Sequence, residues 1–264
     1  MTEPELPSFD LIVATFGRVE PVERLLASLD RQSHRRFRVL LVDQNDDDRL
    51  AHVAGPWLER LTSARGLSRA RNAALERVTA DVVAFPDDDC VYPPHVLERV
   101  ARRLVDEPTL AGVTGRDQSE GWPQDAAELD RDNVWNRAIS FTIFLRRDLV
   151  ERVGAFDERL GLPDSSGEEI DYLIRALATG GRIEYDPELV VTHDPITRDL
   201  VSLGARDGDS IGYILRKHRY PPRTVARMLA RPVAGTAVAL ARGDRTRARF
   251  HFATARARFR GYRQ

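Results

Sequence analysis

The sequence predicts an α/β fold with a largely parallel central sheet, and two observations carry that prediction. Short runs of apolar and β-branched residues alternate with segments of helical period from the N-terminus onward. Each of the early apolar runs also ends in polar residues, as expected where a buried strand reaches the edge of a sheet. Alternation of this kind favours a three-layer α/β/α sandwich.

The first half of the chain contains three predicted strands, each followed by helical segments. The strands are expected at residues 10–16, 37–45 and 81–85. Helices are expected over PVERLLASLDRQ, RLAHVAGPWLERL with a break near Gly55-Pro56, GLSRARNAALERV and PPHVLERVARRL, with Ser68 placed to cap the third. The carboxyl ends of the strands should therefore lie along one edge, where such sheets bind ligands.

The second half changes character. LAGVTGRDQ predicts a strand, and SFTIFLRRDLVERVGAFDERLG predicts a strand and a helix after a polar loop. GEEIDYLIRALATGG predicts a helix that ends at its two glycines, and RIEYDPELVVTHD predicts strands. The remainder is helical in pattern and basic. We therefore expect a domain of residues 1–203 and a basic helical extension of residues 204–264.

Composition excludes several kinds of chemistry. The 264 residues include one cysteine, Cys90, so an internal disulfide is impossible. They include one lysine, Lys217, and nothing resembling GxxxxGK[ST], which disfavours Schiff-base chemistry and a Walker-type phosphate loop. No run of about 18 apolar residues occurs. The N-terminal MTEPELPSFD lacks the features of a signal peptide, so we expect a cytoplasmic location.

Positive charge is concentrated near the C-terminus, although the net charge of the chain is −1. Residues 216–264 contain fourteen Arg or Lys and one acid, Asp244, which gives this segment +13. Four aromatic residues lie among the arginines: Phe250, Phe252, Phe259 and Tyr262. A solvated helical hairpin accounts for this pattern, and so does a basic amphipathic surface on an anionic membrane. We expect no nucleic acid partner, because no recognition motif accompanies the charge.

The stretch FPDDDC places Asp87, Asp88 and Asp89 directly after the third predicted strand. Three adjacent carboxylates repel one another, so we expect positive charge beside them. In an extended segment side chains alternate, which puts Asp87 and Asp89 on one side and Asp88 on the other. Two hard oxygen ligands on one side suit Mg²⁺ or Mn²⁺, and their position at a strand end favours a metal over a solvated turn.

A second acidic cluster lies in GEEID. Glu168, Glu169 and Asp171 occupy the first turn of a predicted helix, where the helix dipole favours acids. The alternative is that one of these carboxylates is a general base. The residue pattern does not decide between the two interpretations.

Three cationic or titratable residues also have two interpretations each. His193 ends an apolar strand, either as a structural side chain or as a metal ligand. Arg69 and Arg71 in GLSRARN are either exposed helix charges or donors to a phosphate, since arginine suits bidentate contacts.

Six motifs in one order resemble a known family. Over residues 8–195 the chain contains VATFGR, LLVDQN, RGLSRARN, FPDDDC, GEEID and VVTH. Their order and spacing are similar to those of the inverting, nucleotide-sugar-dependent glycosyltransferases of family 2, which have the GT-A fold. The resemblance implies a Rossmann-like nucleotide-diphospho-sugar transferase domain. It also implies transfer of a sugar from a nucleotide donor, expected to be a UDP-sugar, to an acceptor hydroxyl.

The resemblance also implies roles for particular residues. Those expected to contact the nucleotide-sugar are Thr15, Arg18, Asp43, Arg69, Arg71, Asp87 and Asp88, with Asp43 at the uracil and Asp88 facing the sugar. Those that match metal ligands, for Mn²⁺ or Mg²⁺, are Asp87, Asp89 and His193. Glu169 matches the catalytic base.

Two departures from the family pattern concern the base and the nucleotide. The family usually has Asp at the base position, within a Glu-Asp pair. This chain has Glu168-Glu169, so Glu168 stays an alternative base. After Asp43 the family often has a second Asp and Gly-Ser, whereas this chain has Gln44-Asn45-Asp46, which leaves the nucleotide open.

The family also suggests a biological setting. Bacterial members build exopolysaccharide and other cell-envelope glycans, which implies a glycan or lipid-linked acceptor. The basic C-terminal segment adds the expectation of peripheral attachment to the inner face of the plasma membrane. Two other classes stay as alternatives. A non-catalytic binding module would lose the base or the carboxylates of the family's DxD motif, which Asp87 and Asp89 match, and both are present. A sugar nucleotidyltransferase usually carries a Gly-rich N-terminal signature with a lysine, and this chain has VATFGR instead.

Overall fold

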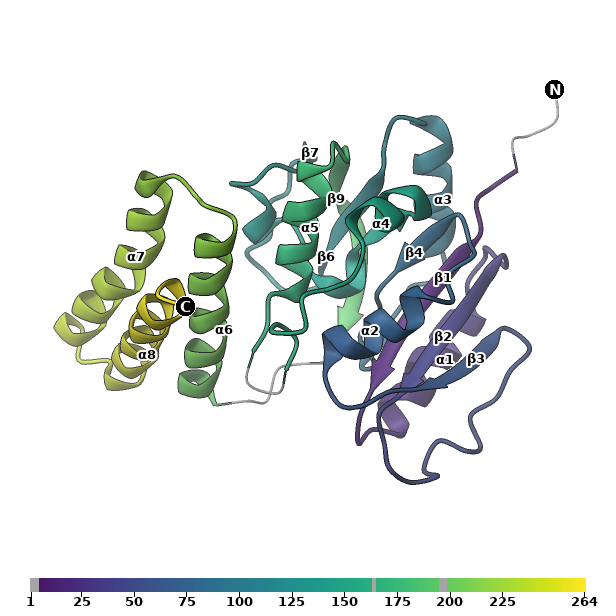
Figure 1. Ribbon diagram of the computed structural model, residues 1–264, viewed down its shortest axis with the longest axis horizontal. Coiled ribbons are helices and arrows are strands. Elements are labelled where there is room, and N and C mark those ends of the chain that lie inside the picture. The colour runs from purple at the N-terminus through teal and green to yellow at the C-terminus, as the bar shows by residue number, and fades with distance from the viewer. Residues whose placement is uncertain (1–4, 163–164, 195–198) are drawn as a thin grey trace. The chain divides into compact units, whose positions relative to one another are not determined.

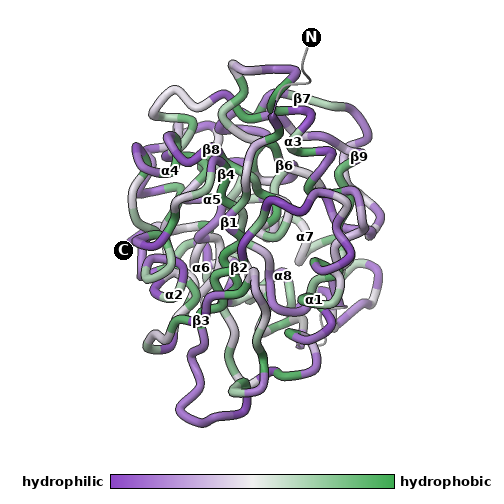
Figure 2. Tube along the Cα trace, turned by 90° about the vertical axis from the view of Figure 1, so that its right-hand side faces the viewer, coloured by the Kyte–Doolittle hydropathy of each residue, from purple (hydrophilic) through white to green (hydrophobic). Residues whose placement is uncertain are grey.

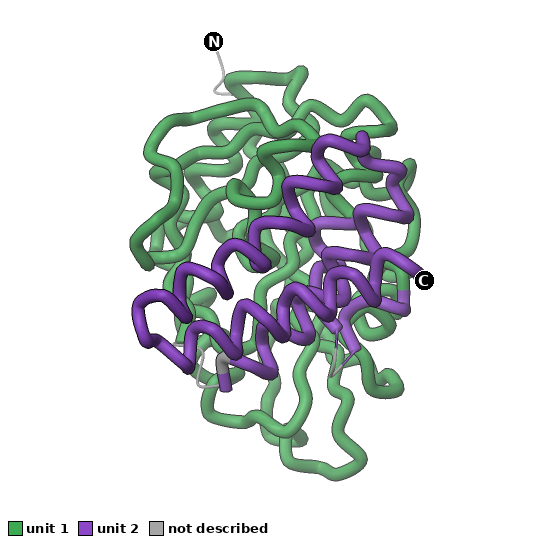
Figure 3. The backbone as a smooth tube through the Cα atoms, turned by 90° about the vertical axis from the view of Figure 1, so that its left-hand side faces the viewer, with its two compact units in different colours: residues 1–157, 172–194 green, residues 158–171, 195–264 purple. Residues whose placement is uncertain are grey.

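The computed structural model describes residues 5–162, 165–194 and 199–264 (Figure 1). They form two compact units, coloured separately in Figure 3: residues 1–157 with 172–194, and residues 158–171 with 195–264. The first unit holds the sheet, and the second consists mainly of three long helices. The expected division into residues 1–203 and 204–264 stays a prediction.

The first unit is built on a large sheet. Among the described residues nine strands form it, in the order β3-β2-β1-β4-β8-β6-β9-β5, and β7 pairs with β9 outside this row. The strands are β1 (Phe9–Thr15), β2 (Phe37–Asp43), β3 (Leu58–Thr62), β4 (Val82–Ala84), β5 (Cys90–Val91), β6 (Gly112–Asp117), β7 (Ala127–Glu128), β8 (Phe144–Arg146) and β9 (Ile183–His193). The row β3-β2-β1-β4 is parallel, and β8 pairs antiparallel with both β4 and β6.

Helices cover the sheet. They are α1 (Glu20–Asp30), α2 (Leu67–Leu75), α3 (Val96–Asp106), α4 (Arg147–Val153) and α5 (Glu168–Ala178). Short 3₁₀ turns occupy Val134–Asn136 and Ser140–Thr142. The early strands and helices alternate along the chain, as the sequence predicts, and Figure 1 shows helices on both sides of the sheet. The predicted α/β sandwich with a mostly parallel sheet is confirmed.

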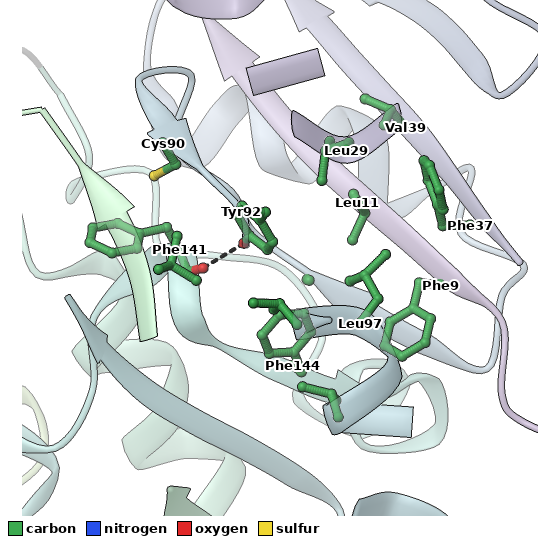
Figure 4. Close-up of a cluster of buried hydrophobic side chains, with 14 of the residues drawn as sticks. Phe9, Leu11, Leu29, Phe37, Val39, Cys90, Tyr92, Leu97, Phe141 and Phe144 are labelled. Atoms are coloured by element: carbon green, nitrogen blue, oxygen red, sulfur yellow. Dashed lines mark hydrogen bonds between the residues drawn. The ribbon is translucent and has the colours of Figure 1, made fainter. Parts of the chain in front are cut away.

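Alternation along β1 shows how the layers are held together. Phe9, Leu11 and Val13 belong to one buried cluster with apolar side chains of α1 and α3, part of which Figure 4 shows. Ile12 is equally buried and lies on the opposite face, because successive side chains of a strand alternate. The central strands are therefore buried on both faces, and green, hydrophobic stretches of the tube lie around the labels β2 and β4 in Figure 2.

One predicted helix is wrong. RLAHVAGPWLERL was expected to be helical, but its last part forms β3, which pairs parallel with β2 in the register Val39↔Leu58. The Trp57 ring packs on Phe37 with centroids 5.4 Å apart, which anchors the strand to the core. Pairing with an existing strand here outweighs local helical preference. A smaller correction concerns Ser68: the N-cap of α2 is Gly66, and Ser68 lies inside the first turn.

The second unit contains α6 (Leu200–Lys217), α7 (Pro222–Ala241) and α8 (Arg245–Tyr262). Gly204, Gly208 and Gly212 recur every fourth residue on α6, so they share one face. That face packs on α8 so closely that a Cβ on Gly212 would lie 2.2 Å from the carbonyl oxygen of Arg258. The glycines are therefore needed for the close approach of these two helices.

A helix that spans a membrane must be both long and apolar. Among the described helices, none combines enough length with enough apolar character to cross a bilayer.

Candidate active site

The polar segments after β1, β2 and β4 lie together at one edge of the sheet. Thr15 pairs with Asp43 in the β1–β2 register, and an isolated parallel bridge joins Ala14 to Asp87. Parallel strands end at the same edge, so these segments are neighbours although about 70 residues of chain separate Thr15 from Asp87. This edge is the candidate active site.

The carboxylate of Asp87 is contacted by two buried residues, Arg71 and Ser140. One carboxylate oxygen, Oδ1, lies 3.2 Å from Nη2 of Arg71, and Oδ2 accepts a hydrogen bond of 2.9 Å from Ser140 Oγ. Arg71 lies on α2 with 1% of its side chain exposed. Its guanidinium packs against the rings of Phe85 and Phe156, 5.6 and 5.5 Å from their centroids. A buried guanidinium needs an anionic partner, and Asp87 provides one.

Asp88 is buried and contacts the end of β1. Its Oδ2 accepts a 2.7 Å hydrogen bond from Thr15 Oγ1, and its Oδ1 accepts one of 2.8 Å from Arg18 Nη1. Burial raises the pKa of this carboxyl to about 6, although the charge of Arg18 and the bond from Thr15 act in the opposite direction. Thr15, Arg18 and Asp88 thus form one connected group.

Asp89 faces a histidine from the opposite end of the sequence. Its Oδ1 lies 3.0 Å from Nε2 of His193. Burial acts to raise the pKa of Asp89, but the hydrogen bond and charge of His193 and the charge of Arg18 lower it overall. The hydrogen bond that His193 donates to Asp89 in turn raises the pKa of His193. Two β-strands make this contact, because β5 pairs with β9 in the register Cys90↔His193.

His193 is also fixed from its other sides. Its ring stacks on Phe141, with centroids 4.9 Å apart and an angle of 8° between the planes. Its backbone N–H donates to Gln118 Oε1, and its carbonyl accepts from Gln118 Nε2, at 3.0 and 2.8 Å. The imidazole therefore has a set position before any ligand binds, as metal ligands require.

The donor atoms near His193 form a group that suits a metal ion. Among the described residues, Asp89, Cys90 and His193 place one ligand atom each within 4.8 Å of one another. Cys90 is buried, and burial, followed by the nearby charges of Asp87 and Asp89, raises the pKa of its thiol well above the usual value. Of the residues that the sequence proposes for metal, the structure brings Asp89 and His193 together.

One expectation about the three aspartates needs correction. Their side chains do not alternate as in an extended strand, because Asp88 and Asp89 lie in a turn and both contact Arg18. The positive charge expected beside them comes from the protein itself, since Arg18 and Arg71 contact these carboxylates. Burial at the strand end makes these charge-assisted bonds necessary.

Residues that depart from the family pattern join the loops of the nucleotide region. Gln44 donates from Nε2 to the Thr15 carbonyl at 3.3 Å and accepts from Gly66 N–H at 2.8 Å. Asn45 Oδ1 accepts from Gly17 N–H at 2.7 Å, and Asn45 Nδ2 donates to Asp43 Oδ1 at 2.7 Å. The segments that precede α1 and α2 are therefore connected to β2.

The outer wall of this region is aromatic and cationic. Phe16 is 41% exposed, and the Arg65 guanidinium lies 3.6 Å from the centroid of its ring. Arg69 is exposed on α2 and donates to the Arg65 carbonyl at 3.3 Å. Arg71, two residues later, is buried at Asp87. The two arginines of the motif therefore have different environments, which the sequence did not indicate.

The carboxylates of GEEID begin α5 in the second unit. Asp171 is fully buried and accepts from Lys217 Nζ at 2.6 Å and from His218 Nε2 at 2.7 Å, both at the end of α6. Glu168 is 4% exposed, while Glu169 is partly exposed. Asp171 is thus a structural contact between helices, and Glu169 is the more accessible of the two glutamates.

Sequence reasoning missed several residues of the site. Ser140, Phe141 and Gln118 support Asp87 and His193, yet they lie outside every motif. Cys90 was considered only as an unpaired cysteine, although it follows the third aspartate directly and lies opposite His193. The position of Cys90 next to the three aspartates could have indicated that it belongs to the site. Ser140, Phe141 and Gln118 reach the site through tertiary packing, and no local sequence pattern indicates them.

Comparison with known proteins identifies the family. The model of the family described as Glycosyl transferase family 2 matches residues 10–162. The pre-mycofactocin glycosyltransferase of Mycobacterium tuberculosis is 29% identical over 79% of this chain, and this chain spans about half (47%) of that relative's length. The succinoglycan biosynthesis protein ExoM of Rhizobium meliloti is 28% identical over 74% of this chain and 69% of its own.

Solved structures add a likeness of fold. The mannosyltransferase PcManGT of Pyrobaculum calidifontis, solved in complex with GDP-Man and Mn²⁺, matches with a TM-score of 0.72 and 18% identity. The match covers 98% of this chain and 88% of that protein. Together with the family model, which covers more than half of the sequence, it confirms the GT-A fold. This chain belongs to glycosyl transferase family 2.

Proposed function

We propose that this protein is a metal-dependent, inverting glycosyltransferase that transfers a sugar from a nucleoside-diphosphate donor to an acceptor hydroxyl. The observation that carries the proposal is the pairing of Asp89 with His193 at the edge that also holds Thr15 and Asp43. A candidate cation site and a candidate nucleotide site thus adjoin at the carboxyl ends of parallel strands.

Asp89 and His193 would hold the divalent cation, and their donor set fits one. A carboxylate oxygen and an imidazole nitrogen suit Mn²⁺, and Mg²⁺ would use the carboxylate with water. A bound cation supplies Lewis-acid stabilisation of the departing nucleoside diphosphate. Asp87, held by Arg71 and Ser140, is proposed to complete the donor contacts as the first residue of the DxD motif.

Glu169 is proposed as the general base. It would accept the proton of the acceptor hydroxyl, whose oxygen then attacks the anomeric carbon from the face opposite the diphosphate. Attack from that face inverts the anomeric configuration, and no covalent intermediate on the protein is needed. The partial exposure of Glu169, compared with the burial of Glu168, supports the choice between the two.

The nucleotide is proposed to lie along Thr15, Asp43 and Arg69, with uracil at Asp43. The UDP-sugar donor rests on the resemblance of LLVDQN to the family motif, and the neighbour of known structure binds GDP-Man. A guanine nucleotide is therefore the second candidate. Arg18 and Arg71 supply positive charge on the diphosphate side of the region.

The setting proposed is synthesis of an exopolysaccharide or another cell-envelope glycan on a glycan or lipid-linked acceptor. The likeness to a succinoglycan biosynthesis protein supports it. A non-catalytic binding protein is disfavoured by the retention of Asp87, Asp89 and Glu169. A nucleotidyltransferase is disfavoured by the match of residues 10–162 to the glycosyltransferase family.

We further propose that the second unit attaches the enzyme peripherally to an anionic membrane. One face of α8 carries exposed residues at alternating spacings of four and three; we call it the α8 stripe, and it comprises Arg245, Arg249, Phe252, Arg256 and Phe259. Phe252 and Phe259 are 62% and 45% exposed. Arginines beside exposed aromatic rings favour a lipid interface with anionic headgroups.

Helix α7 supports a lipid rather than a nucleic acid partner. Its residues 232–241 carry no charge, and Val233, Val238 and Leu240 are each more than half exposed. Exposed aliphatic side chains gain free energy when they leave water for acyl chains, and nucleic acid offers them no such environment. After residue 210 this unit contains one acid, Asp244, and its excess of positive charge is complementary to an anionic surface.

A donor screen tests the proposed activity. UDP-, GDP- and dTDP-sugars are added with Mn²⁺ or Mg²⁺, and the shift in unfolding temperature identifies the nucleotide. A ligand present at about 100 times its Kd stabilises the folded protein by about 2.7 kcal/mol. NMR of the sugar released or transferred from the best donor then reports the anomer. We expect inversion; a product that retains the donor configuration would contradict the mechanism.

A further inference from the structure

Arg18 connects Asp89, a residue of the candidate metal site, with its neighbour Asp88. It follows Gly17 at the end of β1, and its Nη1 donates to Asp88 Oδ1 at 2.8 Å and also to Asp89 Oδ2. Each carboxylate uses its other oxygen elsewhere: Asp88 accepts from Thr15 and Asp89 contacts His193. One nitrogen of Arg18 thus neutralises charge on two adjacent aspartates.

Arg18 and Arg71 differ in how firmly the fold holds them. The Arg71 side chain is 1% exposed and packs against two aromatic rings, so it is a permanent partner of Asp87. The Arg18 side chain is 43% exposed. A long, flexible side chain with its head group partly in water can leave its partner and remain solvated. Arg18 is therefore the cation that can exchange.

The oxygen of Asp89 that Arg18 contacts belongs to the carboxylate that would bind the metal. A guanidinium and a divalent cation both need the negative charge of this carboxylate, and their like charges repel at such short range. Both can be accommodated fully only if Arg18 moves. A diphosphate offers Arg18 an alternative partner of suitable geometry, since arginine binds phosphate oxygens with two parallel hydrogen bonds.

We propose that Arg18 is an exchangeable counter-ion of Asp88 and Asp89, which competes with the divalent cation for Asp89 and transfers to the donor diphosphate when the cation binds. The proposal rests on the proposed function, because it needs both a cation and a nucleotide at this edge. Arg18 then makes cation binding and nucleotide binding cooperative. By linkage, each ligand strengthens the other by the same factor.

Removal of the Arg18 charge should separate the two effects. Without the competing guanidinium, the cation alone binds more tightly, by about tenfold for one unit charge near a partly exposed site. Without the side chain that joins the diphosphate, the nucleotide adds less to cation affinity. A residue that merely supports the fold would weaken cation binding or leave it unchanged, so the direction of the change is diagnostic.

The test is a titration of Mn²⁺, followed by electron paramagnetic resonance, into the wild-type protein and Arg18→Gln. Each titration is made alone and with saturating UDP or GDP. Arg152→Gln is the matched control, because it removes one charge from an exposed ion pair with Asp148, on α4. Arg18→Lys, which keeps the charge, is a second variant, and thermal unfolding confirms that each variant is folded.

We expect Arg18→Gln to bind Mn²⁺ alone about tenfold more tightly than the wild type and Arg152→Gln, with a smaller gain from nucleotide. Arg18→Lys should resemble the wild type in the absence of nucleotide. Equal or weaker binding by folded Arg18→Gln overturns the counter-ion role and leaves the proposed metal site standing. If none of the proteins binds Mn²⁺ under any condition, the proposed metal dependence fails as well, and the inference fails with it.

Discussion

At the scale of single residues, the candidate site is defined by how each aspartate of FPDDDC is compensated. Asp87 is bound by buried Arg71, Asp88 by Thr15 and Arg18, and Asp89 by His193 and Arg18. The three carboxylates therefore have three different environments although they are adjacent in sequence. Asp89 is the one that lies beside an imidazole, which gives it the strongest claim to a metal.

Glu169→Gln tests the proposed base. The amide has nearly the same shape but cannot accept the proton, so we expect transfer to fall by about 10²–10⁴-fold while donor binding is unchanged. The measurement is the steady-state rate of nucleoside diphosphate release with acceptor, together with the donor Kd. Glu168→Gln is the matched control. If Glu168→Gln loses the activity and Glu169→Gln keeps it, the assignment moves by one residue.

The residue types of this site could be predicted from sequence, but their partners could not. The motif FPDDDC and the terminal His193 of VVTH are visible as patterns at strand ends. The contact of Arg18 with both Asp88 and Asp89 depends on a turn that breaks the alternation of an extended strand. The hydrogen bond from Ser140 to Asp87 joins residues 53 positions apart, so no local sequence pattern predicts it.

At the scale of elements, one strand pairing positions His193 in the candidate site, and one helix–helix contact holds the second unit together. The antiparallel pairing of β5 with β9 places His193 opposite Cys90 and so beside Asp89. The glycine face of α6 lets α8 approach closely enough for backbone contact. The first is a register of only two residue pairs, and the second is a packing of small residues over most of a helix.

Gly212→Ala tests the packing of α6 on α8. The added methyl would lie 2.2 Å from a backbone carbonyl oxygen, which cannot move away without separating the helices. Overpacking of this kind costs about 1–3 kcal/mol, measured as the free energy of chemical unfolding. Gly55→Ala is the control, because the nearest atom to its new methyl is 3.7 Å away. Equal unfolding free energies for the two variants would show that α6 and α8 are not closely packed.

The α8 stripe supplies a prediction about membranes. Arg249→Glu with Arg256→Glu reverses two charges on one exposed face, so we expect sedimentation with anionic vesicles at low salt to be lost. Arg35→Glu with Arg152→Glu is the control, since it makes the same charge change at two exposed arginines of the first unit. Binding of the wild type to RNA but not to anionic vesicles would contradict the lipid assignment.

The element that sequence reasoning got wrong is β3. LERLT follows a segment with helical character, and its own composition does not favour a strand. This segment forms a strand because it pairs with β2. The edge of the sheet offers backbone hydrogen bonds, which local helix or strand propensity does not include. The central strands β1, β2 and β4 were predictable because they are buried on both faces and hence continuously apolar.

At the scale of the whole molecule, the family assignment and the site agree. The family model covers residues 10–162, which include the end of β1, the end of β2 and the three aspartates. The second unit contains Glu169 and the α8 stripe, so the proposed base and the proposed membrane surface belong to the same unit. Fold and family were predictable from the order of the motifs. Many family members share these motifs, so the motifs do not distinguish one donor or acceptor from another.

The central claim is that Asp89 holds a divalent cation on which nucleotide binding depends. Calorimetric titration of UDP and GDP, each with Mn²⁺ and again with a chelator, into the wild type and Asp89→Ala tests it most directly. We predict that the wild type binds one of the nucleotides at least about tenfold more tightly with Mn²⁺, and that Asp89→Ala loses this dependence. Unchanged nucleotide and metal affinity in Asp89→Ala would contradict the account.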